Sequence, residues 1–153
     1  MDQDIRGSQL TPKLVDSLYV EAMVLADEAR SYFDVQAEED RAKLEPLARV
    51  GFACESLRVT TRLMHVIAWL LTQRAVAAGE LSPAEGRTPE RRLGDAPESD
   101  HLLARTFPEA ARTLIQASQE LYERVRRLDR ISAEPQTEYS PARTLMSRLE
   151  RSL

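Results

Sequence analysis

The sequence predicts an all-α protein: a three-helix bundle around one long central helix, with a long loop between its second and third helices. Three observations predict this fold class. Apolar residues recur at 3-4 spacing in three long segments. Threonine-proline and serine-proline pairs and a glycine fall where these segments begin or end. The five glycines and the scattered β-branched residues argue against a sheet. We expect residues 1–153 to form one helical domain.

The first helix is expected over residues 12–36. Thr11 and Pro12 supply an N-cap and a proline at the first helical position. The apolar pattern stops between Asp34 and Glu39, so the polar residues 36–43 are expected to connect this helix to an antiparallel neighbour. The residues before it, 1–10, are polar and expected to be mobile. The apolar positions of this helix are Val15, Leu18, Ala22, Leu25, Ala29 and Tyr32.

The central helix is expected over residues 45–78, between Pro46 in its first turn and Gly79 just past its end. At 1.5 Å per residue it would be about 50 Å long. Two apolar stripes run along nearly opposite sides of it, so both sides should be covered. The helices of one chain can bury only one of these sides. The apolar residues left uncovered on the central helix predict a homodimer. The first stripe is Leu47, Val50, Cys54, Leu57, Thr61, Met64, Ala68, Leu71, Ala75 and Ala78; the second is Phe52, Val59, Leu63, Val66, Leu70 and Ala77.

The rest of the chain predicts a loop, a third helix and a tail. Residues 80–105 carry three prolines and two glycines among polar residues, and are either a linker that spans the long helix or a functional loop. The third helix is expected over residues 106–132, with Pro108 in its first turn. The tail, residues 133–153, holds a linker with Pro135 and a short amphipathic helix or mobile segment. One side of that helix carries Leu145, Met146, Leu149 and Leu153, and it needs a surface to bind.

Charge and composition limit the function classes. The net charge is -4, so we expect no nucleic-acid partner, and the arginine run around Arg126, Arg127 and Arg130 is interrupted by acids. The longest apolar run, residues 66–71, is far too short to span a membrane. Without a signal-peptide pattern, we expect a cytoplasmic protein. Eight acids and two bases in residues 12–40 face four arginines and one glutamate in residues 46–78, which predicts paired acidic and basic helices.

Catalytic and metal motifs give no site. There is no phosphate-binding glycine loop, and Glu98 with His101 is a lone pair where a metal needs three or four ligands. We therefore expect no enzyme activity, cofactor or metal. Cys54 lies on the first stripe, which predicts a buried, inert thiol.

One polar line on the central helix is more informative: Glu55, Arg58, Arg62, His65 and Trp69. It has two interpretations. The first is a charged boundary row, in which Arg58 and Arg62 pair with Glu55 and with the acidic first helix. The second is a partner-binding strip, because arginine and tryptophan dominate interface hot spots. A pocket along the same line could bind a small molecule or nucleotide, since paired arginines suit phosphate.

The stretch Glu55–Val76, ESLRVTTRLMHVIAWLLTQRAV, resembles the signature of the RcdA-type family, the alphaproteobacterial "regulator of CtrA degradation" proteins. The similarity extends more weakly over the acidic first helix, Ser82–Arg87 and the third helix with Tyr122. The resemblance implies a dimeric three-helix bundle with a mobile C-terminal segment. It also implies an adaptor for the ClpXP protease primed by a response regulator, which delivers cell-cycle or developmental regulators directly or through a second adaptor. It implies no catalytic residue.

Together these observations predict a non-enzymatic adaptor that acts as a dimeric docking scaffold. The proposed contact residues are Glu55, Arg58, Arg62, His65 and Trp69 on the central helix, and Leu145, Met146 and Leu149 on the tail. The tail, residues 132–153, would act as a tether or docking peptide. The alternative is a helical bundle that binds a small molecule or nucleotide at the Arg58, Arg62, His65 and Trp69 strip.

Overall fold

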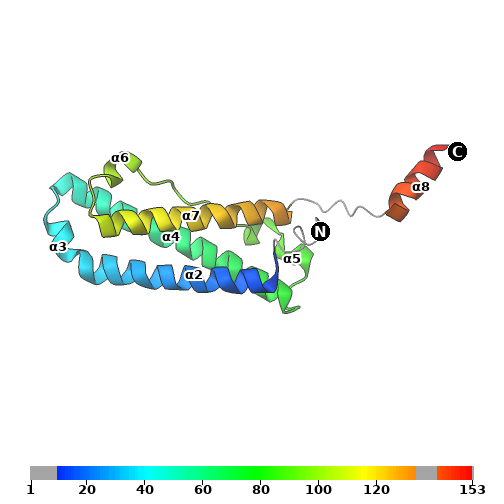
Figure 1. Cartoon of the computed structure of the whole chain (residues 1–153), viewed down its shortest axis with the longest axis horizontal. Coiled ribbons are helices and arrows are strands. Elements are labelled where there is room, and N and C mark those ends of the chain that lie inside the picture. The colour runs from blue at the N-terminus through cyan, green and yellow to red at the C-terminus, as the bar shows by residue number, and fades with distance from the viewer. Residues whose placement is uncertain (1–9, 134–140, 153) are drawn as a thin grey trace.

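Three long helices lie side by side in the computed structural model, which describes residues 10–133 and 141–152 (Figure 1). They are α2 (Pro12–Ser31), α4 (Pro46–Ala77) and α7 (Glu109–Ala133). The predicted all-α three-helix bundle around a long central helix is confirmed, and no strand occurs in the described ranges. Nor does any helix in those ranges have the length and hydropathy needed to cross a bilayer. The expected mobile start, residues 1–9, and the Pro135 linker lie outside the described residues.

The first helix begins as predicted and ends later than predicted. The side chain of Thr11 accepts a hydrogen bond from the amide of Leu14 at 3.2 Å, which caps α2. Helical structure then continues through a π-helix, η1 (Tyr32–Gln36), into α3 (Ala37–Ala42). The predicted polar connection over residues 36–43 is therefore wrong, and only residues 43–45 separate the helical segments.

Buried residues explain why the helix does not stop at residue 36. Ala37 is fully buried, and Tyr32 and Phe33 are nearly so, so this stretch belongs to the core. The hydroxyl of Tyr32 donates to Asp40 at 2.9 Å, and the guanidinium of Arg41 donates to the carbonyl of Phe33 at 2.8 Å. The acidic residues of this segment lie on its solvent side. In the sequence they resemble a polar loop, which explains the wrong prediction.

The bounds of α4 match the prediction to within one residue at each end. Its second stripe faces the core, with five buried members packed against α2 and α7; Ala77 at the end of that stripe is exposed. At one end of the bundle, aromatic rings meet edge to face, with Phe52 at 5.5 Å from Phe33 and 5.3 Å from Phe107. The buried members are Phe52, Val59, Leu63, Val66 and Leu70.

The first stripe of α4 lies on the opposite side and is open to solvent. Its large members, Leu47, Val50, Leu57, Met64 and Leu71, are between 46% and 83% exposed. Cys54 is also exposed, so its prediction as a buried core thiol is wrong. Both long helices, α2 and α7, pack on the side of α4 that carries Phe52, and the other stripe stays uncovered.

The segment after α4 is ordered and returns along that helix. It contains α5 (Pro83–Gly86), a 3₁₀ turn η2 (Pro89–Arg91) and α6 (His101–Ala104), and both α5 and α6 contact α4. The third helix starts three residues later than predicted, so Pro108 precedes it. The tail forms α8 (Pro141–Ser152), which stands apart from the bundle in Figure 1. We call residues 92–100, the extended chain between η2 and α6, the strap.

Candidate functional site

The predicted polar line lies beneath the strap. Glu55 is fully buried, Arg62 and Trp69 are 2% exposed, and Arg58 and His65 are half-buried. These residues face the strap and α7 rather than solvent, because the polar line runs beside the core stripe of α4.

Glu55 holds the end of the strap. One carboxylate oxygen accepts hydrogen bonds from Arg58 at 2.6 Å and from the backbone amide of Asp100 at 3.0 Å. The other oxygen accepts from the hydroxyl of Ser99. A buried carboxylate is tolerated only when it is paired and hydrogen-bonded, and Glu55 meets both conditions.

Arg62 binds the middle of the strap and joins it to α7. Its guanidinium donates to the carbonyl of Pro97 and to the hydroxyl of Ser118, each at 3.2 Å, and also to Ser99. Burial lowers the pKa of Arg62 from its ordinary value, and the nearby Glu55 carboxylate acts in the opposite direction by favouring the charged form. The hydroxyl of Ser99 thus forms hydrogen bonds with both Glu55 and Arg62. The opposite charges of these two residues stabilise each other in the buried space under the strap.

Trp69 continues the network toward the start of the strap. Its indole nitrogen donates to Asp129 of α7 at 2.9 Å. The same carboxylate accepts two hydrogen bonds from Arg92, both at 2.9 Å, in a bidentate pair. The hydroxyl of Tyr122 donates to the carbonyl of Gly94 at 2.7 Å. The strap is therefore fixed at both ends, to α4 and to α7.

His65 packs directly against the strap backbone. A Cβ atom added at Gly94 would lie 2.3 Å from the imidazole Nδ1, so no other residue fits there without moving the ring. This contact explains the half-buried state of His65 as packing against the strap.

Replacing Gly94 with alanine is expected to destabilise the protein by about 1–3 kcal/mol, because the new methyl group overpacks against the His65 ring. Urea unfolding of Gly94→Ala, His65→Ala and the double variant measures this. We expect a favourable coupling of roughly 0.5–3 kcal/mol in the double variant, since a smaller side chain at residue 65 makes room for the methyl group. Additive effects would contradict the packing of His65 on Gly94.

The polar line binds the strap and α7, and we call this intramolecular hydrogen-bond network the clamp. Every buried side-chain nitrogen and oxygen in the described ranges has a hydrogen-bond partner, so Glu55, Arg62 and Trp69 are satisfied without a second molecule. The boundary-row interpretation placed Arg58 on Glu55, and the structure shows that pair. It also placed Arg62 against the first helix, whereas Arg62 binds the strap and α7. A partner-binding role for the five residues stays a prediction. Among them, only the half-buried Arg58 and His65 have side-chain surface that a partner could contact.

Two ion pairs join the acidic helix α2 to its neighbours, one to the basic helix α4 and one to α7. Arg74 of α4 lies 3.1 Å from Asp16 of α2, as the charge pattern of these helices predicted. Arg124 of α7 pairs with Glu21 of α2. These pairs are about half exposed, so they contribute at most about 1 kcal/mol each.

Sequence reasoning missed the residues that complete the clamp. Ser118 and Asp129 are buried polar residues of α7, and Ser99 is a buried polar residue of the strap. A signal was present for Asp129, which follows Val125 by four residues and so falls on the apolar side of its helix. A carboxylate at such a position requires a buried donor, and Trp69 and Arg92 supply it.

The exposed first stripe of α4 is the strongest candidate docking surface of the bundle. Leu57 and Met64 are 66% and 65% exposed near the middle of the helix, two turns apart on one side. A row of large apolar side chains rimmed by polar residues is typical of a protein interaction site. The predicted tail residues are also accessible, since Leu145, Met146 and Leu149 of α8 are all exposed.

The predicted small-molecule pocket is only partly assembled. A cavity of about 330 Å³ lies beside the strap, and Arg62, Tyr122 and Arg126 line it. Arg58, His65 and Trp69 do not line it, because they point to other parts of the clamp. The four residues of the predicted strip thus do not converge on one ligand space.

Comparisons with known proteins find a family and a solved structure that are similar to this chain. The sequence profile of the family described as "Protein of unknown function (DUF1465)" matches residues 7–153. The crystal structure of RcdA from Caulobacter crescentus CB15 is similar to this chain, with 36% sequence identity and a TM-score of 0.65. The similarity covers 80% of this chain and 93% of that one. No curated protein sequence matches the chain.

Proposed function

The chain belongs to the RcdA-type family, whose profile carries the name DUF1465, and from this membership we propose that it is an adaptor for regulated proteolysis. The predicted family is thereby confirmed. In the proposed role, the protein helps to deliver cell-cycle or developmental regulators to ClpXP, primed by a response regulator and with or without a second adaptor. It does so as a dimeric docking scaffold and without catalysis.

Family membership carries the adaptor role, and the exposed apolar row on α4 supports its dimeric form. Helix α4 buries one side in the core and exposes five large apolar residues on the other side. Such an exposed apolar row is suited to binding other proteins. The clamp supports the same role, because it makes the bundle rigid and leaves docking to surfaces away from the strap. A preorganised surface loses less conformational entropy on binding.

We assign the exposed row of α4 to the homodimer contact. A two-fold contact is isologous, so the same row from two copies would face itself. Such a contact covers Leu57 and Met64 of both copies and leaves α2, α7 and α8 to other partners. Cargo and protease docking would then use surfaces of those three elements.

A reconstituted degradation assay tests the adaptor role. Purified ClpXP, its response regulator and a candidate cargo are combined with and without the protein, and cargo loss is followed over time. We expect faster cargo loss with the protein, because tethering raises the effective cargo concentration at the protease. If every cargo tried is degraded at the same rate in both reactions, the proposed role is wrong.

The cavity beside the strap supports a second candidate function, the binding of a small anionic molecule or nucleotide. Its lining includes Arg62, Arg126, Glu98 and Glu123, and Arg126 is the cation that could pair with phosphate oxygens, since Arg62 is held by the strap and α7. A thermal-shift panel of nucleotides and metabolites tests this. A ligand at a hundred times its dissociation constant stabilises the fold by about 2.7 kcal/mol, a readily measured shift. A panel without any shift removes this candidate.

A further inference from the structure

The C-terminal helix α8 has an apolar side that no described element covers. Leu145, Met146 and Leu149 lie within four residues of one another on one side of this helix and are 57% to 62% exposed. A twelve-residue helix is marginal in water on its own, and its stability depends on packing of that side. We therefore expect the apolar side of α8 to pack against a surface of this chain or of a partner.

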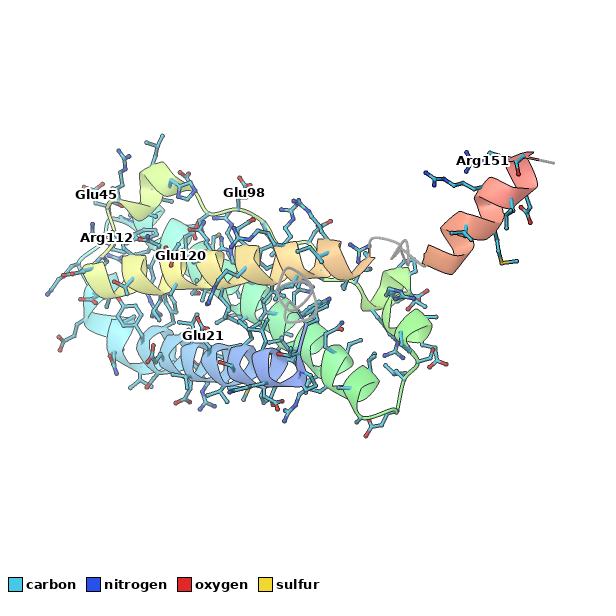
Figure 2. The ribbon with its side chains drawn as sticks, turned by 45° about the vertical axis from the view of Figure 1, so that its right-hand side comes forward. Glu21, Glu45, Glu98, Arg112, Glu120 and Arg151 are labelled. Atoms are coloured by element: carbon cyan, nitrogen blue, oxygen red, sulfur yellow. The ribbon has the colours of Figure 1, made fainter. Side chains whose placement is uncertain are left out.

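A groove between α2 and α7 has the matching chemistry. It has a volume of about 740 Å³, and Val24, Leu25 and Ala117 form its apolar part. Val24 is 53% exposed, so its side chain is available to a docking helix. Figure 2 shows Glu21 on α2 and Glu120 on α7, the two helices that border this groove.

The charges of the groove and of α8 are opposite. The groove rim holds four glutamates and two arginines, which gives a side-chain charge of -2. Helix α8 holds three arginines and one glutamate, which gives +2. Arg148 lies about 60° from Leu145 on the helix wheel, at the edge of the apolar side, where it would meet the rim. The rim residues are Glu21, Glu28, Glu120, Glu123, Arg124 and Arg127.

The chain is long enough to bring α8 back to the groove. From Ala133 to Pro141 there are eight residue steps, which can span at most about 26–29 Å. Along α7, Arg127 lies about 9 Å from Ala133 and Ala117 about 24 Å, so the whole groove is within reach. The length of α8, about 18 Å, also matches the roughly 15 Å between Ala117 and Arg127.

We propose that α8, which stands apart from the bundle in this structure (Figure 1), docks in solution in the α2–α7 groove of its own chain. Its leucines and methionine cover Val24 and Leu25, and its arginines lie along the glutamates of the rim. The short connection gives α8 a millimolar effective concentration at the groove, so a weak contact suffices. The groove thus recognises a basic amphipathic helix, and a partner helix of that kind must displace α8 to bind. This intramolecular contact goes beyond the adaptor role and does not depend on it.

Hydrogen exchange of the full chain, read by mass spectrometry on peptides from α8, tests this. Val24→Asp places a charge in the groove, and Val20→Asp places the same charge one turn away on α2, outside the groove lining. Both valines are exposed, at 53% and 61%, so both variants should fold, which circular dichroism checks. We expect α8 amides to exchange about tenfold faster in Val24→Asp than in the wild type, and at the wild-type rate in Val20→Asp.

Two results would overturn the proposal. Equal exchange of α8 in the wild type and in Val24→Asp would show that α8 does not use this groove. Protection that rises with protein concentration would show that α8 binds a second copy rather than its own chain. Protection that depends on Val24 and is constant from 1 to 100 µM, the range of concentrations to be sampled, supports docking within one chain.

Discussion

Replacing Glu55 with leucine is expected to lower the free energy of unfolding by about 3–5 kcal/mol, a large part of the stability of a protein of this size. The substitution removes the acceptor for Arg58, Ser99 and the amide of Asp100. It also leaves the Arg62 guanidinium buried without its nearest negative charge. The cost of an uncompensated buried charge, and not the loss of any single hydrogen bond, sets this magnitude.

Urea unfolding followed by far-UV circular dichroism measures the effect of Glu55→Leu. Glu39→Gln is a suitable control, because it removes a carboxylate from an exposed position on α3. We expect that control to stay within about 0.5 kcal/mol of the wild type. A Glu55→Leu variant as stable as the control would mean that the clamp contributes nothing to folding.

Replacing Leu57 with aspartate is expected to weaken self-association by roughly a thousandfold. In an isologous contact each substitution counts twice, because both copies carry it. A hot-spot truncation costs about 2 kcal/mol or more, so two of them cost about 4 kcal/mol, or three powers of ten in the dissociation constant. The fold itself should be unaffected, since Leu57 is 66% exposed within one chain.

Sedimentation equilibrium over a range of concentrations measures this change. Leu102→Asp on α6 is the matched control, because Leu102 is 76% exposed and is not a member of the first stripe of α4. We expect Leu102→Asp to self-associate like the wild type. Equal weakening in both variants would point to a general effect of surface charge and would remove the α4 row from the interface.

The sequence predicted the helices well where local signals are strong. Pro46 in a first turn and Gly79 just past a helix end fixed the bounds of α4 to within one residue. Gly79 has a positive φ of 78°, the backbone conformation that favours glycine at such an end. The end of the first helix was misplaced because Ala37 is buried in the core, although acidic residues surround it in the sequence.

Periodicity could not tell which stripe of α4 faces the core. Both stripes have the same 3-4 spacing, and the choice depends on where α2 and α7 pack, which is tertiary information. Cys54 was misassigned to the core for this reason. The stripe with Phe52 is the buried one, since a large aromatic ring gains most from burial and meets other rings there.

The clamp could not be predicted because its partners are far apart in the sequence. Arg62 binds residues 37 and 56 positions away, and Trp69 binds one 60 positions away. From the sequence, Glu55, Arg62 and Trp69 formed a polar row of uncertain role. Only the path of the strap over α4 shows that this row binds the chain to itself.

The most direct test of the central claim, that the first stripe of α4 is covered by a second copy, uses Cys54. This thiol is the single cysteine of the chain and is exposed on that stripe. The rate at which a small thiol reagent labels it is measured from nanomolar to micromolar protein. We predict that labelling slows as concentration rises through the dimer dissociation constant and stays fast in Leu57→Asp. A rate that is the same at every concentration would contradict the claim.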